Sequence, residues 1–411
     1  MNTTDRHEQK STVEEGKMAK YAVIALSKQS IPNVLFLKQF EDDFDNLIII
    51  TTQEAEKDFK ALDSIKHFIN GNNVKINSVQ VIADSFHDVY YQLKNQDFDK
   101  ESTYLINLTG GTKVTSLAIY EHFREYSKAS FFYLAIGKNS YYKVSKEEKH
   151  SENAIGYRLS VNGYLKAYNI NLPNKKTTVL NNMECAERMY GYYNDKYFHD
   201  HIPLLLEIRK KFHDKKKLKI SYTEIKQRSV KPLSLKDIFE KDKDDVYAFL
   251  DRIVNVLNEF EGKEQHITKK WIDYISGGWF EEYIYHHLNQ FAITDIKTGF
   301  HIKQENLPNE IDIAFTKDNG LYFIECKTSM KDSDDKSIAN DTIFKLDALS
   351  NLMGIGVKKY LLTLDQETYS TDNVKKRLEQ FRIITPDPAD LVPEKIDDTL
   401  ADLFKIKKRE N

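Results

Sequence analysis

From Tyr21 onward, short apolar runs alternate with segments in which apolar residues recur at helical spacing. Five runs, beginning at about residues 21, 47, 78, 104 and 129, read YAVIAL, LIIITT, SVQVIA, YLINLT and ASFFYLAIG. Strands that alternate with helices build a parallel sheet covered by helices. The pattern therefore predicts an α/β first domain of doubly wound type over residues 19–170.

The pattern changes after the fifth run. A hairpin is expected around GKNS (137–140), followed by the strand-like segments YRLSV and YLKAY, and the polar stretch NLPNKKTTVLNN ends the domain. Residues 171–264 have mainly helical periodicity, as in IPLLLEIRKKF and DDVYAFLDRIVNVLNEF. Their basic piece KKFHDKKKLK is interpreted as a solvated helix end, with nucleic-acid contact as the alternative.

A second α/β domain is expected over residues 265–411, with the strands IDIAF, LYFIEC and KKYLLTL and helices on either side. Two domains agree with a length of 411 residues, which is too long for one ordinary core. Residues 1–18 are polar, lack the apolar core of a signal peptide, and are expected to form a disordered tail.

Composition limits the chemistry. The 60 Lys and Arg against 63 Asp and Glu give a net charge of -3, which argues neither for nor against a nucleic-acid partner. Cys185 and Cys326 are the only cysteines, so a disulfide framework and a cysteine-based zinc site are excluded, and a reducing cytoplasm is expected. No apolar run approaches the ~20 residues of a membrane span.

The second domain carries charged residues inside an apolar hairpin, EIDIAFTKDNGLYFIECKTS. A two-residue turn at Asn319 and Gly320 would set Asp312 opposite Lys327. Side-chain alternation then puts Glu325 on the same face. Two carboxylates suit Mg²⁺ or Mn²⁺, and a nearby lysine can orient a water and stabilise developing negative charge. The spacing therefore indicates chemistry for cutting phosphodiesters.

A second acidic position lies upstream, in ISGGWFEEYIYHHL. On this helix Glu281 shares a face with apolar residues at i+3, i+4 and i+7, so its carboxylate is expected to point partly inward, whereas Glu282 is expected to face solvent. His286 and His287 are adjacent instead of four residues apart, so a structural pair is favoured over a zinc helix.

The order of a helical Glu, I-D-I and E-C-K resembles the PD-(D/E)xK, or restriction-endonuclease-like, fold over residues 270–365, although the residue before the Asp is Ile instead of Pro. The resemblance implies that Asp312 and Glu325 hold Mn²⁺ or Mg²⁺, and that Lys327 assists the attacking water. It further implies two supporting metal contacts, from the backbone carbonyl of Cys326 and from Glu281.

By the same resemblance, Lys345 in the following helix, TIFKLDALSNL, would approach a phosphate of the substrate. A surface ion pair on an edge hairpin is the structural alternative for the whole motif. The apolar flanks and the helical Glu281 favour the nuclease interpretation.

The first domain carries a glycine turn in LINLTGGTKVTSL. Gly110 and Gly111 allow a tight turn, and Thr112 can cap a helix that begins with Lys113. Backbone N–H groups, a helix N-terminus and a lysine favour an anion such as a phosphate. The turn is neither a Walker A loop nor a GxGxxG fingerprint, so it predicts neither ATP hydrolysis nor NAD. A plain glycine turn with a solvated lysine is the alternative.

The first strand is followed by SKQSIPN, with Ser30 before a helix that has Pro32 in its first turn. In the strand order 3-2-1-4-5, strands 1 and 4 flank the switch point where ligands bind. The segments SKQSIPN and TGGTK are therefore expected side by side.

S-x-x-x-I-P-N and N-x-T-G-G-T-K resemble a CARF domain, the Rossmann-like sensor of type III CRISPR systems. This implies a cyclic oligoadenylate ligand, most simply cyclic tetra-adenylate, bound across a homodimer, since a ring of four identical nucleotides can share a two-fold axis with the dimer. The implied contacts are Gln29, Ser30, Asn33, Thr109, Gly110, Gly111, Thr112 and Lys113.

Together the two motif sets resemble the CARF nucleases of antiviral defence. The expected activity is a messenger-activated, metal-dependent nuclease that cuts DNA or RNA, with single strands and supercoiled DNA as candidate substrates. Two alternatives stay open. One is a nucleotide-responsive DNA-binding regulator with an idle nuclease-like domain, and the other is an unregulated repair or restriction nuclease.

Overall fold

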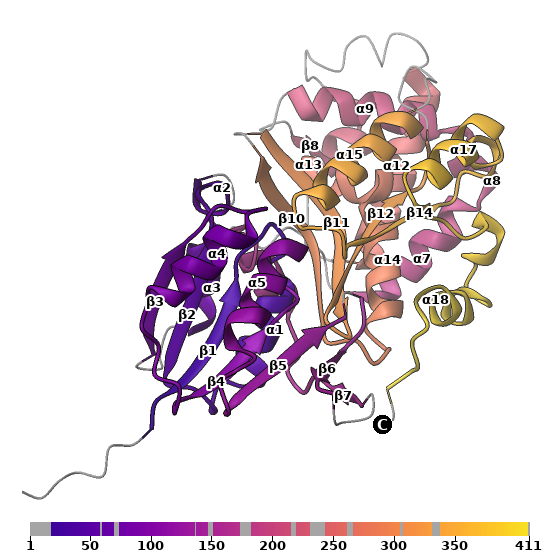
Figure 1. Cartoon of the computed structure of the whole chain (residues 1–411). Helices are drawn as coiled ribbons and strands as arrows, with labels where there is room; N and C mark the ends of the chain where they lie inside the picture. Colours follow the sequence, from indigo (N-terminus) through magenta and orange to yellow (C-terminus); the bar gives the residue numbers. More distant parts are fainter. Residues whose placement is uncertain are drawn as a thin grey trace, which may run out of the picture. The chain divides into compact units, whose positions relative to one another are not determined.

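The computed structural model divides the chain into two compact units, Met1–Tyr157 with Ala167–Asn169 and Arg158–Lys166 with Ile170–Asn411 (Figure 1). The structure describes residues 18–57, 60–69, 74–135, 137–146, 151–172, 182–214, 219–230, 243–260, 266–304, 307–330 and 338–409. Within these ranges no helix has the length and apolarity that crossing a membrane requires.

The first unit holds a seven-stranded sheet of order β3-β2-β1-β4-β5-β6-β7. Its first five strands are parallel and the last two antiparallel. The strands are β1 (Lys20–Ala25), β2 (Asn46–Thr51), β3 (Lys75–Gln80), β4 (Thr103–Asn107), β5 (Ala129–Leu134), β6 (Ser140–Val144) and β7 (Glu152–Ala154). This Rossmann-like order confirms the predicted 3-2-1-4-5 arrangement.

Helices flank the parallel strands because the inner strands, such as β1 and β2, are largely apolar and buried, whereas the edge strand β3 is mostly exposed. One side of the sheet packs on α4 and α5 through a core that includes Val23, Ile106 and Ile119. The helices are α1 (Ile31–Gln39), α2 (Gln53–Lys57), α3 (Ala61–Ile69), α4 (Phe86–Lys94) and α5 (Lys113–Phe123).

The predicted strands YRLSV and YLKAY are wrong. The structure has no strand there. The helix α6 (Val161–Lys166) takes the last residue of the first segment and the first three residues of the second. One tertiary and one local contact stabilise the start of this helix: Asp295 Oδ2 accepts a hydrogen bond from the Val161 N–H (2.9 Å), and the neighbouring Ser160 Oγ accepts one from the Gly163 N–H (3.0 Å). Both bonds satisfy amides that the start of a helix leaves open.

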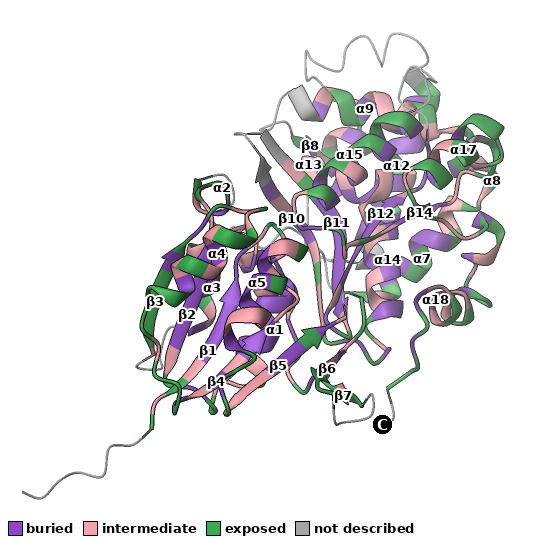
Figure 2. Ribbon diagram, viewed as in Figure 1, coloured by how far each residue is buried: buried purple, intermediate pink, exposed green. Residues whose placement is uncertain are grey.

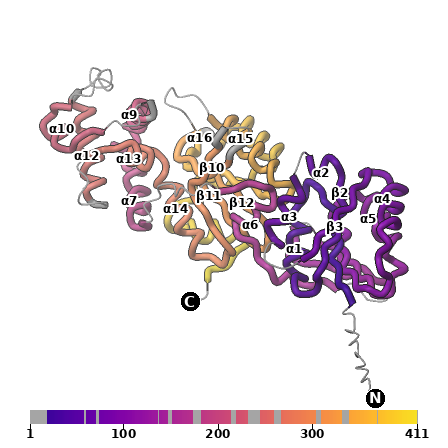
Figure 3. Tube along the Cα trace, turned by 90° about the vertical axis from the view of Figure 1, so that its left-hand side faces the viewer, coloured from indigo at the N-terminus to yellow at the C-terminus, as the bar shows by residue number. Residues whose placement is uncertain are grey.

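The second unit begins with helices, as its periodicity predicts, and Figure 3 shows α9, α10 and α12 gathered together. A small sheet of β8 (Lys219–Ser221) and β9 (His266–Thr268) joins them. The helices are α7 (Met183–Tyr193), α8 (Lys196–Asp200), α9 (Ile202–Asp214), α10 (Tyr222–Lys226), α12 (Lys243–Phe260) and α13 (Lys269–Asp273), and a π-helical turn, Tyr274–Gly278, follows. Part of the basic piece KKFHDKKKLK lies outside the described residues.

A five-stranded sheet of order β10-β11-β12-β13-β14 forms the rest of the second unit. Its central strands are almost wholly buried (Figure 2). The strands are β10 (Asp295–Gln304), β11 (Leu307–Lys317), β12 (Gly320–Lys327), β13 (Lys358–Thr363) and β14 (Ile383–Ile384). The helices are α14 (Trp279–Leu288), α15 (Ala339–Asn351), α16 (Gln366–Tyr369), α17 (Asp372–Gln380) and α18 (Ile396–Phe404).

Candidate functional site

The hairpin of β11 and β12 turns one residue earlier than predicted. Lys317 is paired with Gly320, so Asp318 and Asn319 form the turn. Both have positive φ (49° and 58°), as a type I′ turn requires. The side chain of Asn319 fixes this choice, because its Oδ1 accepts a hydrogen bond from the Leu159 N–H (2.7 Å) in a buried position.

The earlier turn shifts each cross-strand partner by two positions. Side chains alternate with a period of two, so the shift changes partners without changing faces. Continued along the strands, the observed register sets Asp312 opposite Glu325 instead of opposite Lys327. All three side chains stay on one face of the sheet.

On this face the charged groups form one contact network. Lys327 Nζ lies 3.2 Å from Asp312 Oδ2 and 2.6 Å from Glu325 Oε1, and it also donates to the Cys326 carbonyl (3.2 Å). The Cys326 N–H donates to Asp312 Oδ2 (2.8 Å). Lys345, on α15, donates to both oxygens of Glu325 (2.9 and 3.0 Å). The two carboxylates are buried, whereas the side chains of Lys327 and Lys345 are 25% and 28% exposed, so the network lies at the boundary between the interior and the surface.

Burial and mutual repulsion separate the pKa values of the acids. Burial, and then the charge of Glu325, raise the pKa of Asp312 to about 6. Burial also acts to raise the pKa of Glu325, but Lys327 and Lys345 outweigh it and lower that pKa. Burial lowers the pKa of a lysine, yet the two acids raise the pKa of Lys327 above its usual value. Glu325 and Lys327 therefore stay charged at neutral pH.

Glu281 joins this network from α14. Burial, and then the nearby charge of Asp312, raise its pKa well above the usual range of a glutamate, and Lys327 acts against them. The prediction that Glu282 faces solvent is wrong. Its side chain is fully buried, and its Oε1 accepts a hydrogen bond from the Asn182 N–H (3.0 Å). Because α14 packs against both the sheet and α7, two of its faces are buried.

The adjacent histidines of α14 have separate partners. His287 Nδ1 lies 2.7 Å from Asp397 Oδ1 on α18, and His286 Nε2 lies 3.7 Å from Glu282 Oε1. The His287 contact joins α14 to α18, whereas the His286 contact lies within α14 itself. Both agree with the structural interpretation of the pair.

Two further polar residues lie on the face of Asp312 and were missed from the sequence. Glu310 is paired with His301 of β10, two residues along the strand from Asp312. The charge of Glu310 contributes to the raised pKa of Glu281. The alternation of Ile296, Phe300 and Ile302 in DIKTGFHIK is the signal that could have revealed β10 and its polar face.

The oxygen donors here are of the kind that Mg²⁺ and Mn²⁺ prefer, namely two carboxylates and the Cys326 carbonyl. Among the described residues, no three His, Cys, Asp or Glu side chains converge closely enough to hold a metal ion. Mg²⁺ keeps several waters and needs only one or two protein carboxylates. The donor set therefore fits such an ion, in competition with the two lysines that now hold Glu325.

The glycine turn of the first unit lies against the end of β1. A Cβ added to Gly110 would lie 2.2 Å from the carbonyl oxygen of Ala25, and Gly111 has a φ of +75°. Thr112 caps α5 as predicted, since its Oγ1 accepts a hydrogen bond from the Thr115 N–H (3.2 Å). Lys113 is exposed at the start of the helix.

The two predicted ligand loops are joined by side-chain amides. Asn33 Nδ2 donates to the Ala25 carbonyl (2.8 Å), and Asn107 Nδ2 donates to Asn33 Oδ1 (2.8 Å). Asn107 Oδ1 in turn accepts from the Thr109 N–H (3.0 Å). SKQSIPN and TGGTK are thus side by side, as expected. Asn33 is 1% exposed, so its side chain serves the joint between the loops, and sequence reasoning missed its partner Asn107.

The other residues that were predicted to contact the ligand differ in their burial and hydrogen bonding. Ser30 is buried at the start of α1 without a side-chain cap bond, and Gln29 beside it is partly exposed. Thr109 Oγ1 accepts a hydrogen bond from the Leu134 N–H (2.7 Å), which ties the glycine turn to β5.

Models of known protein families match each of the two halves of the chain. The family model described as "Card1 CARF domain" matches residues 22–164, and the model described as "Card1-like, endonuclease domain" matches residues 268–403. A comparison with curated protein sequences finds no significant match.

Two solved structures share the fold over nearly the whole chain. Can2 from Sulfobacillus thermosulfidooxidans, solved in complex with cyclic tetra-adenylate, is 21% identical, with a TM-score of 0.64 over 91% of this chain and 95% of that one. Protein VC1899 from Vibrio cholerae is 16% identical, with a TM-score of 0.70 over 94% and 98% of the two chains.

Proposed function

Because the chain belongs to the family that joins a Card1-type CARF domain to a Card1-like endonuclease domain, we propose that it is a nuclease activated by cyclic oligoadenylate in type III CRISPR antiviral defence. The observation that carries the proposal is the buried contact of Lys327 with both Asp312 and Glu325. The proposed division is a sensor over residues 19–170, a helical connecting region over 171–264 and a nuclease over 265–411.

The nuclease step would use a divalent ion, Mn²⁺ or Mg²⁺, held by Asp312, Glu325 and the Cys326 carbonyl, with Glu281 completing or orienting the site. Such an ion neutralises charge on a phosphate oxygen and lowers the pKa of a bound water. Lys327 stays protonated beside two acids, so it orients the water and stabilises negative charge and does not act as a base.

The sensor would bind cyclic tetra-adenylate, the ligand named for the Can2 structure. The loops after β1 and β4 converge at the switch point of the sheet and offer the Lys113 ammonium and the start of α5 to its phosphates. The proposed contacts are those implied by the resemblance, namely Gln29, Ser30, Asn33, Thr109, Gly110, Gly111, Thr112 and Lys113.

A homodimer would present two copies of these loops to one ring. Apolar side chains on α4 and α5 support a subunit contact, since Leu117 is 61% exposed, Tyr91 46% and Phe86 44%. Leu117 lies one turn after Lys113, next to the proposed ligand site. Replacing Leu117 with Lys is expected to shift the protein toward monomer in sedimentation velocity, and an unchanged dimer would exclude this face.

Activation of the nuclease by the messenger then depends on a difference in messenger affinity between two arrangements of the subunits. The messenger can activate the nuclease only by binding one arrangement of the subunits more tightly than the other. In that arrangement the two nuclease sites would be assembled or opened.

The deciding experiment is cleavage of labelled single-stranded DNA, single-stranded RNA and supercoiled plasmid with Mn²⁺ or Mg²⁺, each with and without cyclic tetra-adenylate. Cleavage that needs both metal and messenger, and that Asp312→Ala abolishes while messenger binding is retained, is the expected result. Cleavage without messenger would remove the sensor role. Absence of cleavage with every cyclic oligoadenylate would favour a nucleotide-responsive DNA-binding regulator.

A further inference from the structure

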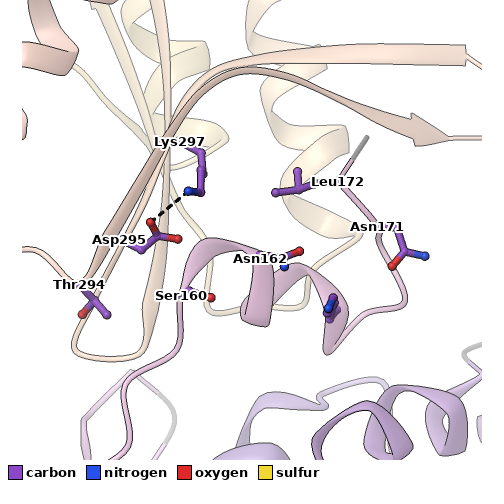
Figure 4. A pocket seen from close by; sticks show the side chains of 8 residues that line it. Ser160, Asn162, Asn171, Leu172, Thr294, Asp295 and Lys297 are labelled. Atoms are coloured by element: carbon purple, nitrogen blue, oxygen red, sulfur yellow. Dashed lines mark ion pairs between the residues drawn. The ribbon is translucent and has the colours of Figure 1, made fainter. Parts of the chain in front are cut away.

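A pocket of about 790 Å³ lies beside the start of β10 in the second unit, and none of the roles above uses it (Figure 4). Its walls come from α6, from the residues that follow it and from the strand. Figure 4 shows Asn162 on the helix and Asn171 on the following segment on one side, with Asp295 and Lys297 on the strand opposite. Lys166 also lines the pocket.

The lining groups are mostly donors without partners in the protein. Within the described part of the chain, the Lys166 ammonium and the side-chain amides of Asn162 and Asn171 make no hydrogen bond or ion pair. Asp295 is the one carboxylate among the lining residues, and its Oδ2 already accepts from the Val161 N–H (2.9 Å). Its Oδ1 lies 3.5 Å from Lys297 Nζ. Two ammonium groups and two amides therefore face one committed carboxylate, which favours an anion rich in acceptor oxygens.

The pocket lies close to the nuclease carboxylates on the same sheet. Lys297 is paired with Ala314 of β11, and Ala314 is two residues along that strand from Asp312. Residues two apart on a strand share a face and lie about 7 Å apart, and the neighbouring strand adds about 5 Å across the sheet, a diagonal of about 8 Å. Stacked nucleotides rise about 3.4 Å each, so two or three nucleotides span this separation.

We propose that this pocket binds the sugar-phosphate backbone of the substrate strand, two or three nucleotides from the bond that is cut. The inference rests on the proposed nuclease function and names a subsite for its substrate. Lys166 and Lys297 supply the charge, and the amides of Asn162 and Asn171 supply hydrogen bonds to phosphate and sugar oxygens. Asp295 is a positioning residue, because it holds both Lys297 and the first turn of α6.

The test measures binding without cleavage. Fluorescence anisotropy of labelled single-stranded DNA and RNA is followed with EDTA and cyclic tetra-adenylate present, over a series of salt concentrations. The variant carries Lys166→Ala and Lys297→Ala, the charge-keeping variant carries Arg at both positions, and Lys226→Ala on α10 is the control, an exposed lysine of the same unit outside the pocket.

The double Ala variant is expected to bind about tenfold more weakly, and its slope of log affinity against log salt is expected to fall by about 0.7 for each phosphate that the variant no longer neutralises. The Arg variant and Lys226→Ala should match the wild type. Unchanged affinity and slope in the double Ala variant, or no oligonucleotide binding by the wild type, would overturn the pocket assignment. Cleavage is assayed separately on the wild type, so an oligonucleotide that is bound through the pocket but never cut would support the pocket while removing the nuclease function.

Discussion

The ammonium of Lys345 bridges both carboxylate oxygens of Glu325, at 2.9 and 3.0 Å, from a different element of the fold. Glu325 also receives Lys327 at 2.6 Å, so one buried carboxylate holds two cations. An ammonium group on a carboxylate oxygen competes with a metal ion for the lone pairs of that oxygen. The sequence resemblance assigns Lys345 to a substrate phosphate, whereas the structure shows it as an internal counter-ion of a proposed metal ligand.

Replacing Lys345 with Gln is therefore expected to strengthen Mn²⁺ binding in the absence of substrate. A hydrogen bond to a charged group contributes about 1.5 kcal/mol, so the gain should be about tenfold in affinity. Titration calorimetry of the full-length protein measures it directly. Lys359→Gln is the matched control. Lys359, on β13, pairs at 2.5 Å with Asp347, which lies on α15 like Lys345 but outside the contact network of Glu325. Equal or weaker Mn²⁺ binding in the Lys345 variant would contradict the competition.

The buried Asp312 predicts a pH dependence of stability. Its pKa rises from 3.8 in the unfolded chain to about 6 in the fold, so stability is highest when it is protonated and falls as pH rises from about 4 to 6. At pH 8 its charge costs about 3 kcal/mol, at about 1.36 kcal/mol per pKa unit. In the presence of a chelator that removes metal ions, Asp312→Asn should therefore unfold at a higher urea concentration than the wild type at pH 8.

This advantage should shrink as pH is lowered from 6 toward 4, because the wild-type carboxyl then binds a proton in the fold. Asp318→Asn, at an exposed carboxylate in the turn of the same hairpin, is the control for replacing an Asp with Asn. An advantage of the same size at pH 8 and pH 5 would show that burial does not raise the pKa of Asp312.

The sequence predicted what depends on local periodicity. Five apolar runs predicted the five parallel strands, because an inner strand covered on both faces is largely apolar; the edge strand β3 is mostly exposed. The shared face of Asp312, Glu325 and Lys327 was predictable for a different reason. A hairpin turn displaced by one residue on each strand leaves the alternation of side chains unchanged.

What the sequence could not predict depends on contacts between distant segments. Glu282 looks like a solvent-facing position from its own helix, and only the packing of α7 on α14 buries it. The turn at Asp318 and Asn319 is selected by a hydrogen bond from Leu159, about 160 residues earlier in the chain. The helix at 161–166 is likewise set by Asp295, which no local pattern links to it.

The glycine turn of the first unit gives a prediction about messenger binding. Gly110→Ala would place a Cβ 2.2 Å from the backbone oxygen of Ala25, so the loops after β1 and β4 must move apart. We expect cyclic tetra-adenylate binding, measured by calorimetry, to fall by at least tenfold. Gly191→Ala, on α7, is the control. A Cβ added there has no atom within 4 Å, and Ala is more favourable than Gly in a helix. Full messenger binding by the Gly110 variant would remove this turn from the ligand site.

The buried Glu282 gives a prediction about what holds the helix of Glu281 in place. Its side chain is fully buried, and its Oε1 accepts a hydrogen bond from the Asn182 N–H at 3.0 Å. Gln keeps an acceptor for Asn182 and removes a buried charge, whereas Ala leaves the amide unpaired, at a cost of about 1–3 kcal/mol. Glu282→Gln should therefore melt at or above the wild-type temperature, and Glu282→Ala several degrees below it. Equal melting of the two variants would show that the bond to Asn182 does not anchor α14.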